Sequence, residues 1–300
     1  MHRRIFVQLV ACLFLAWQVL HAQDITLANK PDSVKFAAMG DNGTGDTPQY
    51  DIANLMTKVR DTFKFEFVIM LGDNMYGSQN PNDFERKFST PYKTLLDGGV
   101  KFYAALGNHD NQKNVFFKPW NMGGERYYTF KKNNVRFFAL DSDYIDPKQK
   151  EWLEKQLSSS NDDWKIVFFH HPLYSSAGRH GSEVDLRVLL EPIFVKYGVN
   201  VVFSGHDHVY ERIKPQQGIY YFLSGAAGQL RRGDLQKSDL TAAGYDQDRS
   251  FMLIEIDKDD FLFEAISRTG KAVDSGSFKR QKKDAAQSTQ SKQSPQNSPR

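Results

Sequence analysis

Cysteine is nearly absent from this sequence. Among 300 residues only Cys12 is a cysteine, and it lies in the N-terminal segment. Everything that follows has neither a thiol nor a disulfide, which excludes a disulfide framework. A chain of this length can bury an adequate hydrophobic core without cross-links. We therefore expect one domain of about 250 residues.

Long hydrophobic runs are also missing, apart from one near the N-terminus. Arg3 and Arg4 precede an apolar stretch, residues 5–20, which two glutamines interrupt. This pattern is typical of a secretory signal peptide, and the stretch is too short and too interrupted for a stable membrane span. We expect residues 1–22 to be a signal peptide. The predicted destination is extracellular or periplasmic, or an acidic organelle. Residues 9–12 resemble a bacterial lipobox, so lipidation is the second interpretation.

A strong charge of one sign is missing from most of the chain. The formal net charge is +3, but residues 279–300 hold six basic residues against one acidic residue. Without this tail and the two N-terminal arginines, residues 23–278 carry about −4. The basic pI belongs to the tail and indicates no nucleic-acid partner. The tail is rich in Gln and Ser and has few apolar residues, which predicts that residues 279–300 are disordered.

Strands and helices are predicted to alternate between these two ends. Helices are expected over residues 47–63, 82–96, 147–157 and 184–197. Strands are expected over residues 33–39, 66–71, 100–106, 127–130, 135–140, 164–169, 199–203, 219–223, 251–256, 261–266 and 272–278. Alternation early and antiparallel strands late predict an α/β fold with two mixed sheets between helices. We expect a four-layer α/β/β/α sandwich formed by a single domain, residues 30–278.

Five of the predicted strands end in residues that can bind metal ions. These ends are Gly40-Asp41, Gly72-Asp73, Gly107-Asn108-His109, Phe169-His170 and Gly205-His206-Asp207-His208. Glycine lets a chain turn sharply at a strand exit, and the strand exits of an α/β sheet share one rim. One Gly-Asp is ordinary turn chemistry. Five such ends together predict a metal centre.

The number of donors favours two metal ions over one. The candidate ligands are Asp41, Asp73, Asn108, His170, His206 and His208, and Tyr76 lies three residues beyond Asp73. They are too many for a single ion that keeps a position open for water. Divided between two ions about 3.5–4 Å apart, they leave room for water and a substrate oxygen. Asp73 is the expected bridge, because its strand should lie centrally.

The five strand-end motifs, in this order, resemble the motifs of the calcineurin-like metallophosphoesterases. Within that superfamily they resemble most the purple acid phosphatases in their small tartrate-resistant form. The resemblance spans residues 34–278. Two details favour the purple branch. Gly43 follows Asp41-Asn42 where most of the superfamily has a histidine. Tyr76 occupies the position at which the purple enzymes carry the tyrosinate that binds ferric iron.

The resemblance implies a ligand set for each metal. It implies Fe(III) held by Asp41, Tyr76 and His208, a divalent Fe, Zn or Mn held by Asn108, His170 and His206, and Asp73 as the bridge. The hard phenolate and carboxylate suit Fe(III), and imidazoles suit a borderline divalent ion.

The implied protein is a secreted acid phosphatase that hydrolyses phosphate monoesters by attack of a metal-bound hydroxide. His109 would contact the phosphate and His180 would assist the leaving group, whereas His171 is expected to support the site without touching substrate. Arg179 precedes His180 where mammalian members have an acidic residue, so the proton-donor arrangement is expected to differ. The expected partner is a phosphate ester, either a small molecule or a phosphoprotein, and the expected state is a monomer.

Two other functions stay open on the sequence. A phosphodiesterase or nucleotide pyrophosphatase would share the fold and the metal ligands. A catalytically weak, metal-binding scaffold protein would retain them without turnover. Hydrolysis of a phosphate monoester compared with that of a diester separates these alternatives.

Overall fold

The first sheet grows from three parallel, apolar strands. β1 (Val34–Met39), β2 (Phe67–Leu71) and β3 (Lys101–Ala105) pair in parallel, and every residue of β1 and β2 is buried. Such continuous burial is expected of strands covered on both faces. The computed structural model describes residues 27–281. The other three strands of the first sheet pair antiparallel: β11 (Ser250–Asp257), β12 (Asp260–Ser267) and β13 (Ala272–Lys279). The order of all six strands is β13-β12-β11-β1-β2-β3.

The second sheet has parallel strands at its centre and antiparallel strands at its edges. Its order is β10-β8-β9-β7-β6-β5-β4, and β5, β6, β7 and β9 run parallel. The strands are β4 (Tyr128–Lys132), β5 (Val135–Ala139), β6 (Trp164–Phe168), β7 (Val201–Ser204), β8 (Tyr210–Ile213), β9 (Tyr220–Ser224) and β10 (Thr241–Tyr245).

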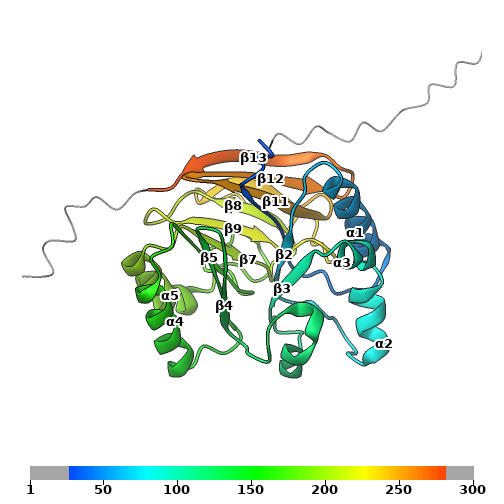
Figure 1. Ribbon diagram of the computed structural model, residues 1–300, viewed down its shortest axis with the longest axis horizontal. Coiled ribbons are helices and arrows are strands. Elements are labelled where there is room, and N and C mark those ends of the chain that lie inside the picture. The colour runs from blue at the N-terminus through cyan, green and yellow to red at the C-terminus, as the bar shows by residue number, and fades with distance from the viewer. Residues whose placement is uncertain (1–26, 282–300) are drawn as a thin grey trace, which may run out of the picture.

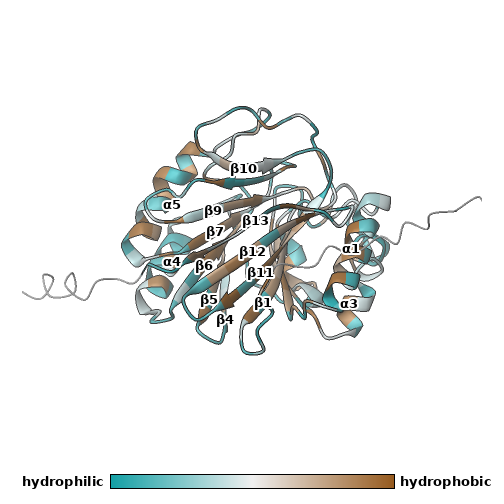
Figure 2. Ribbon diagram, turned by 90° about the horizontal axis from the view of Figure 1, so that it is seen from above, coloured by the Kyte–Doolittle hydropathy of each residue, from teal (hydrophilic) through white to brown (hydrophobic). Residues whose placement is uncertain are grey.

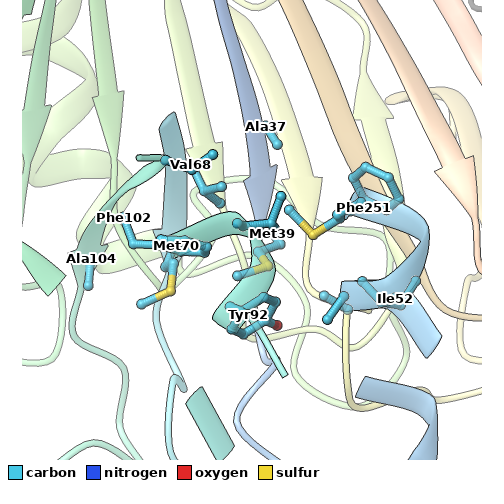
Figure 3. Packing of buried hydrophobic residues seen from close by; sticks show 14 of the residues in the cluster. Ala37, Met39, Ile52, Val68, Met70, Tyr92, Phe102, Ala104 and Phe251 are labelled. Carbon is cyan, nitrogen blue, oxygen red and sulfur yellow. The ribbon is translucent and has the colours of Figure 1, made fainter. Parts of the chain in front are cut away.

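Helices cover the outer face of each sheet, which confirms the predicted four-layer α/β/β/α fold (Figure 1). The first sheet is covered by α1 (Thr47–Arg60), α2 (Pro81–Phe84) and α3 (Lys93–Asp97), and the second by α4 (Pro147–Ser159) and α5 (Val184–Tyr197). Figure 3 shows Ile52 of α1 beside Met39 and Phe251 of the first sheet. No helix within residues 27–281 is long and apolar enough to cross a membrane.

The central core lies between the two sheets, where the strands are the most hydrophobic part of the molecule (Figure 2). Phe36 of β1 stacks on Phe67 of β2, with ring centroids 5.2 Å apart. Both rings also meet Phe137 of β5 edge-on at 5.3 Å. Because aromatic side chains bury large apolar areas, these contacts hold the sheets face to face.

Truncating this cluster is expected to destabilise the whole domain. Phe36→Ala should lower the free energy of unfolding in urea by about 3–5 kcal/mol, because it leaves a cavity between the sheets. Phe116→Ala is the matched control, because the Phe116 side chain is 71% exposed; its effect should stay within about 0.5 kcal/mol. Equal effects would contradict the assignment of Phe36 to the central core.

The helix predicted over residues 82–96 is interrupted. α2 passes into a π-helical turn, Glu85–Ser89, and α3 begins only at Lys93. Pro91 explains the break, because proline offers no backbone N–H and crowds the preceding turn. β8 and β10 were not predicted. Their short segments carry charged residues and glycine and become strands only through pairing with each other and with β9.

The folded domain continues slightly beyond its predicted end. β13 runs to Lys279, and Arg280 donates to the Asp259 carboxylate at 2.7 Å and to that of Asp163 at 2.9 Å. These first basic residues of the predicted tail therefore belong to the domain. The predicted signal peptide and the rest of the tail lie outside the described residues.

Candidate metal centre

The carboxyl ends of the parallel strands in both sheets meet at one edge of the sandwich. Asp41, after β1, donates its backbone N–H to the carbonyl of Gly72, after β2, at 3.0 Å. The backbone N–H of His206, after β7 of the second sheet, donates to Asp41 Oδ2 at 2.9 Å. One hydrogen-bonded rim therefore joins the loops of both sheets, where α/β folds commonly bind ligands.

Two glycines in this rim leave no room for a side chain. A Cβ on Gly72, whose φ is +89°, would lie 2.5 Å from His170 Nδ1. A Cβ on Gly205 would lie 2.5 Å from Asp41 Oδ2. Both distances are far below van der Waals contact, so a larger residue would displace a candidate ligand.

Three candidate ligands have strained backbones. Asp41, Asp73 and His206 have φ angles of +55°, +52° and +73°, in the left-handed region that residues other than glycine seldom adopt. Each such residue costs about 1–3 kcal/mol and persists where the surrounding structure enforces it. Among residues 27–281, three of the eight non-glycine residues with positive φ are therefore predicted ligands, and such strain at converging ligands is typical of a functional site.

The first group of donors consists of Asp41, Tyr76 and His208. The Tyr76 hydroxyl donates to Asp41 Oδ1 at 3.0 Å and lies 3.1 Å from His208 Nε2. His208 Nε2 is 3.3 Å from the same carboxylate oxygen. Burial, with the charges of Asp41 and Asp73, raises the pKa of Tyr76 far above its usual range. The phenol therefore keeps its proton unless a cation compensates the phenolate.

The second group consists of Asn108, His170 and His206. Asn108 Oδ1 lies 3.1 Å from both His170 Nε2 and His206 Nδ1, and these two nitrogens are 3.2 Å apart. His170 Nδ1 donates to the Leu71 carbonyl at 2.9 Å, which leaves its Nε2 to face the group. Burial and the neighbouring His170 lower the pKa of His206 to about 2. His206 is therefore a neutral imidazole, the form that binds metals.

Asp73 lies between the two groups. Its Oδ1 is 3.4 Å from His170 Nε2, and Asp73 also shares a potential metal-binding cluster with Asp41 and His208. Burial would raise the pKa of Asp73, but His170 and the N–H of His109 hold it well below its usual range. Burial would likewise lower the pKa of His170, yet Asp73 raises it to about 9. A positive charge is thus stabilised beside Asp73.

The two histidines predicted to act on substrate stand at the rim of this cluster. The His109 ring is 4.7 Å from that of Tyr76, centroid to centroid, and its side chain is 51% exposed. The His180 ring is 4.3 Å from that of His206. Burial and the charges of Arg231 and Arg179 lower the pKa of His180. All six histidines within residues 27–281 gather at this site.

Sequence reasoning missed the carboxylates that support these loops. Asp110 accepts hydrogen bonds from the backbone N–H groups of Asn74 and Gly107, at 3.1 and 3.0 Å, and ties two ligand loops together. Asp207 accepts from the Ser175 hydroxyl at 2.6 Å and from the Gly181 N–H at 3.2 Å, so it anchors the loop that carries His180. Burial raises the pKa of Asp110 to about 7 and that of Asp207 to about 6. Their positions directly beside predicted ligands were the available sequence signal.

His171 also belongs to this region. One of its ring nitrogens lies within 4.8 Å of ligand atoms of His170 and His206. Burial and the neighbouring His170 lower its pKa to about 3. The sequence predicted a supporting role for His171, and the structure places its ring beside the second donor group, 4.4 Å from that of His206.

Comparison with known proteins yields a consistent set of relatives. A family model described as Calcineurin-like phosphoesterase matches residues 34–210, a range that contains every candidate ligand. Tartrate-resistant acid phosphatase type 5 of Rattus norvegicus is 25% identical, over 87% of this chain and 95% of the rat protein.

Solved structures share the fold. A purple acid phosphatase from yellow lupin (Lupinus luteus) superposes with a TM-score of 0.69 at 19% identity, over 84% of this chain and 55% of the lupin chain. GAP50, described as the anchor in the inner membrane complex of Plasmodium, gives a TM-score of 0.74 at 20% identity, over 84% and 90% of the two chains.

Proposed function

This chain belongs to the family of calcineurin-like phosphoesterases, and we propose that it is a secreted acid phosphatase specific for phosphate monoesters. The proposed cofactors are Fe(III) and a second, divalent metal, either Fe, Zn or Mn. The observation that carries the proposal is the position of the Asp73 carboxylate between two donor groups of different chemistry.

The donors fit two unlike metals. Asp41 and Tyr76 offer a carboxylate and a phenol oxygen, which suit Fe(III) when ionised, with His208 beside them. Asn108, His170 and His206 offer an amide oxygen and two imidazole nitrogens, which suit a borderline divalent ion. Asp73 would contribute to both sites. When bound, such a metal pair polarises a phosphate ester and lowers the pKa of water.

The residues at the rim have roles that do not depend on their binding a metal. His109 is exposed beside Tyr76, where it can donate a hydrogen bond to a phosphate oxygen. His180 would protonate the departing alkoxide, a general-acid role that needs a held position. Asp207 supplies that position through its hydrogen bonds to the ends of the loop, at Ser175 and Gly181.

Removal of the proposed acid should affect poor leaving groups most. We expect His180→Ala to lower kcat/KM for an alkyl phosphate about a hundredfold, within the usual range for general-acid catalysis. For p-nitrophenyl phosphate, whose leaving group needs little protonation, the loss should be below about tenfold. Steady-state kinetics on both esters measure the difference. Equal losses would contradict the general-acid role of His180.

The function itself is tested by comparing a monoester with a diester. Purified, metal-loaded protein should hydrolyse p-nitrophenyl phosphate with a kcat/KM at least about tenfold above that for bis(p-nitrophenyl) phosphate. The monoester has a dianionic phosphate group, and an interaction of about 1.4 kcal/mol that only this group makes in the transition state raises kcat/KM tenfold. A preference for the diester would indicate a phosphodiesterase. Hydrolysis of neither ester by protein with two bound metals would indicate a binding or scaffold protein.

A further inference from the structure

One serine organises the backbone beside the second donor group. Ser142 lies in the loop between β5 and α4, and its Oγ accepts the backbone N–H groups of His170 at 3.2 Å and His171 at 3.0 Å. The same Oγ lies 3.0 Å from Nδ1 of the His171 ring. Ser142 therefore has three hydrogen-bond neighbours from two consecutive histidines.

Counting protons assigns the tautomer of His171. A serine hydroxyl has two lone pairs and one proton. The two backbone N–H groups occupy both lone pairs, so the single hydroxyl proton is left for His171 Nδ1. A neutral imidazole whose Nδ1 accepts must carry its own proton on Nε2.

His171 is thus the opposite of its neighbour His170 in the hydrogen bond that its Nδ1 makes. His170 donates from Nδ1 to the Leu71 carbonyl, so its Nε2 is the nitrogen that offers a lone pair once a bound cation displaces the Nε2 proton. In His171 the Nδ1 lone pair accepts from Ser142, and Nε2 is protonated, so neither nitrogen has a lone pair left for a metal. Proximity alone would group His171 with His170 and His206 as metal ligands, but the hydrogen bonds distinguish it as a donor.

The Nε2–H group of His171 has no acceptor within hydrogen-bond distance among residues 27–281. The carboxylate of Asp143 is 3.9 Å from Nε2, too far for a hydrogen bond. The His171 ring lies 4.4 Å from that of His206 and 5.0 Å from that of His170, centroid to centroid. A positioned, neutral donor therefore stands directly against the second donor group.

We propose that His171 binds substrate: its Nε2–H donates to an oxygen of the phosphate group, and Ser142 holds the ring in the tautomer that makes this possible. The inference rests on the proposed phosphatase function and adds a residue to it. His171 is neutral in this role, so it can bind a phosphate oxygen without forming an ion pair with the Asp143 carboxylate, 3.9 Å from its Nε2. Ser142 is a positioning residue.

Two substitutions of the same histidine separate the roles of its two nitrogens. The amide of His171→Asn occupies roughly the place of Nδ1 and has no group at Nε2, whereas that of His171→Gln reaches the place of Nε2. With inorganic phosphate as the probe, calorimetry on metal-loaded protein should show about tenfold to hundredfold weaker binding for His171→Asn. His171→Gln should recover most of the affinity, and both variants should retain two metal ions per chain.

A third variant tests the positioning step. Ser142→Ala should weaken phosphate binding and raise KM several-fold, and combined with His171→Asn it should add little, because both changes remove the same contact. Ser158→Ala is the matched control, because this exposed serine hydroxyl on α4 donates to the Lys155 carbonyl within its own helix and has no other hydrogen bond among residues 27–281. Its phosphate affinity should equal that of the wild type.

The outcomes are distinct. Loss of a metal ion from both His171→Asn and His171→Gln would overturn the proposal and make His171 a ligand. Unchanged phosphate affinity in His171→Asn would overturn it by showing that no contact exists, as would a wild type that binds no phosphate. If the wild type binds phosphate but hydrolyses no ester, the phosphatase function fails, and the affinity of the variants still decides the contact.

Discussion

Asp73→Asn is expected to lower kcat/KM by about a thousandfold or more. Asparagine has the size of aspartate and still accepts the His109 N–H, but it removes the charge that lies between the two donor groups. Metal-ion catalysis supplies several kcal/mol, and a loss of about 4 kcal/mol corresponds to a factor of about a thousand. Metal analysis should show that the variant binds fewer than two ions per chain.

The control for this prediction is Asp97→Asn. Asp97 is an exposed carboxylate on α3 whose ion-pair partner among residues 27–281 is Lys93, one helical turn away, so its substitution should leave activity and metal content unchanged. Circular dichroism on both variants shows whether the fold is kept. An Asp73→Asn protein with two metals and wild-type turnover would refute the proposed bridging position.

Tyr76→Phe is expected to abolish the visible absorption of the iron-loaded protein. The phenol is the only tyrosine oxygen in the first donor group, 3.0 Å from Asp41 Oδ1. Since burial and two carboxylates raise its pKa so far, its ionisation requires a strong cation such as Fe(III). A ferric phenolate absorbs visible light by charge transfer, and phenylalanine has no oxygen to supply it. Absorption spectra of both proteins, with iron content measured in parallel, give the result.

Tyr50→Phe is the matched control, because the Tyr50 hydroxyl donates to the Arg86 carbonyl on the exposed side of α1. It should leave the visible band intact. A colourless wild-type protein with bound iron would show that the ferric–tyrosinate assignment is wrong. The proposed phosphatase function would still hold, with Zn or Mn as the bound metals in place of iron.

Several properties followed from the sequence because they depend on neighbours along the chain. Apolar strands and the glycines that end them are local features, and the alternation of strands and helices along the chain is enough to predict sheets covered by helices. The same logic predicted that Asp41, Asp73 and Asn108 would meet, because parallel strands bring their carboxyl ends to one edge. The structure places the side chains of His170, His206 and His208 at that edge as well.

Other features depend on residues far apart in the chain, and only the tertiary structure decided them. β8 and β10 are strands because they pair, and Arg280 is ordered because Asp259 and Asp163 lie beside it. The Ser142 hydroxyl lies 3.0 Å from Nδ1 of His171, 29 residues further along the chain, and this contact determines which ring nitrogen carries the proton. Residue types along the chain indicate which side chains could bind a metal. Which nitrogen of a histidine keeps its lone pair is determined by hydrogen bonds, and those form only when distant segments pack together.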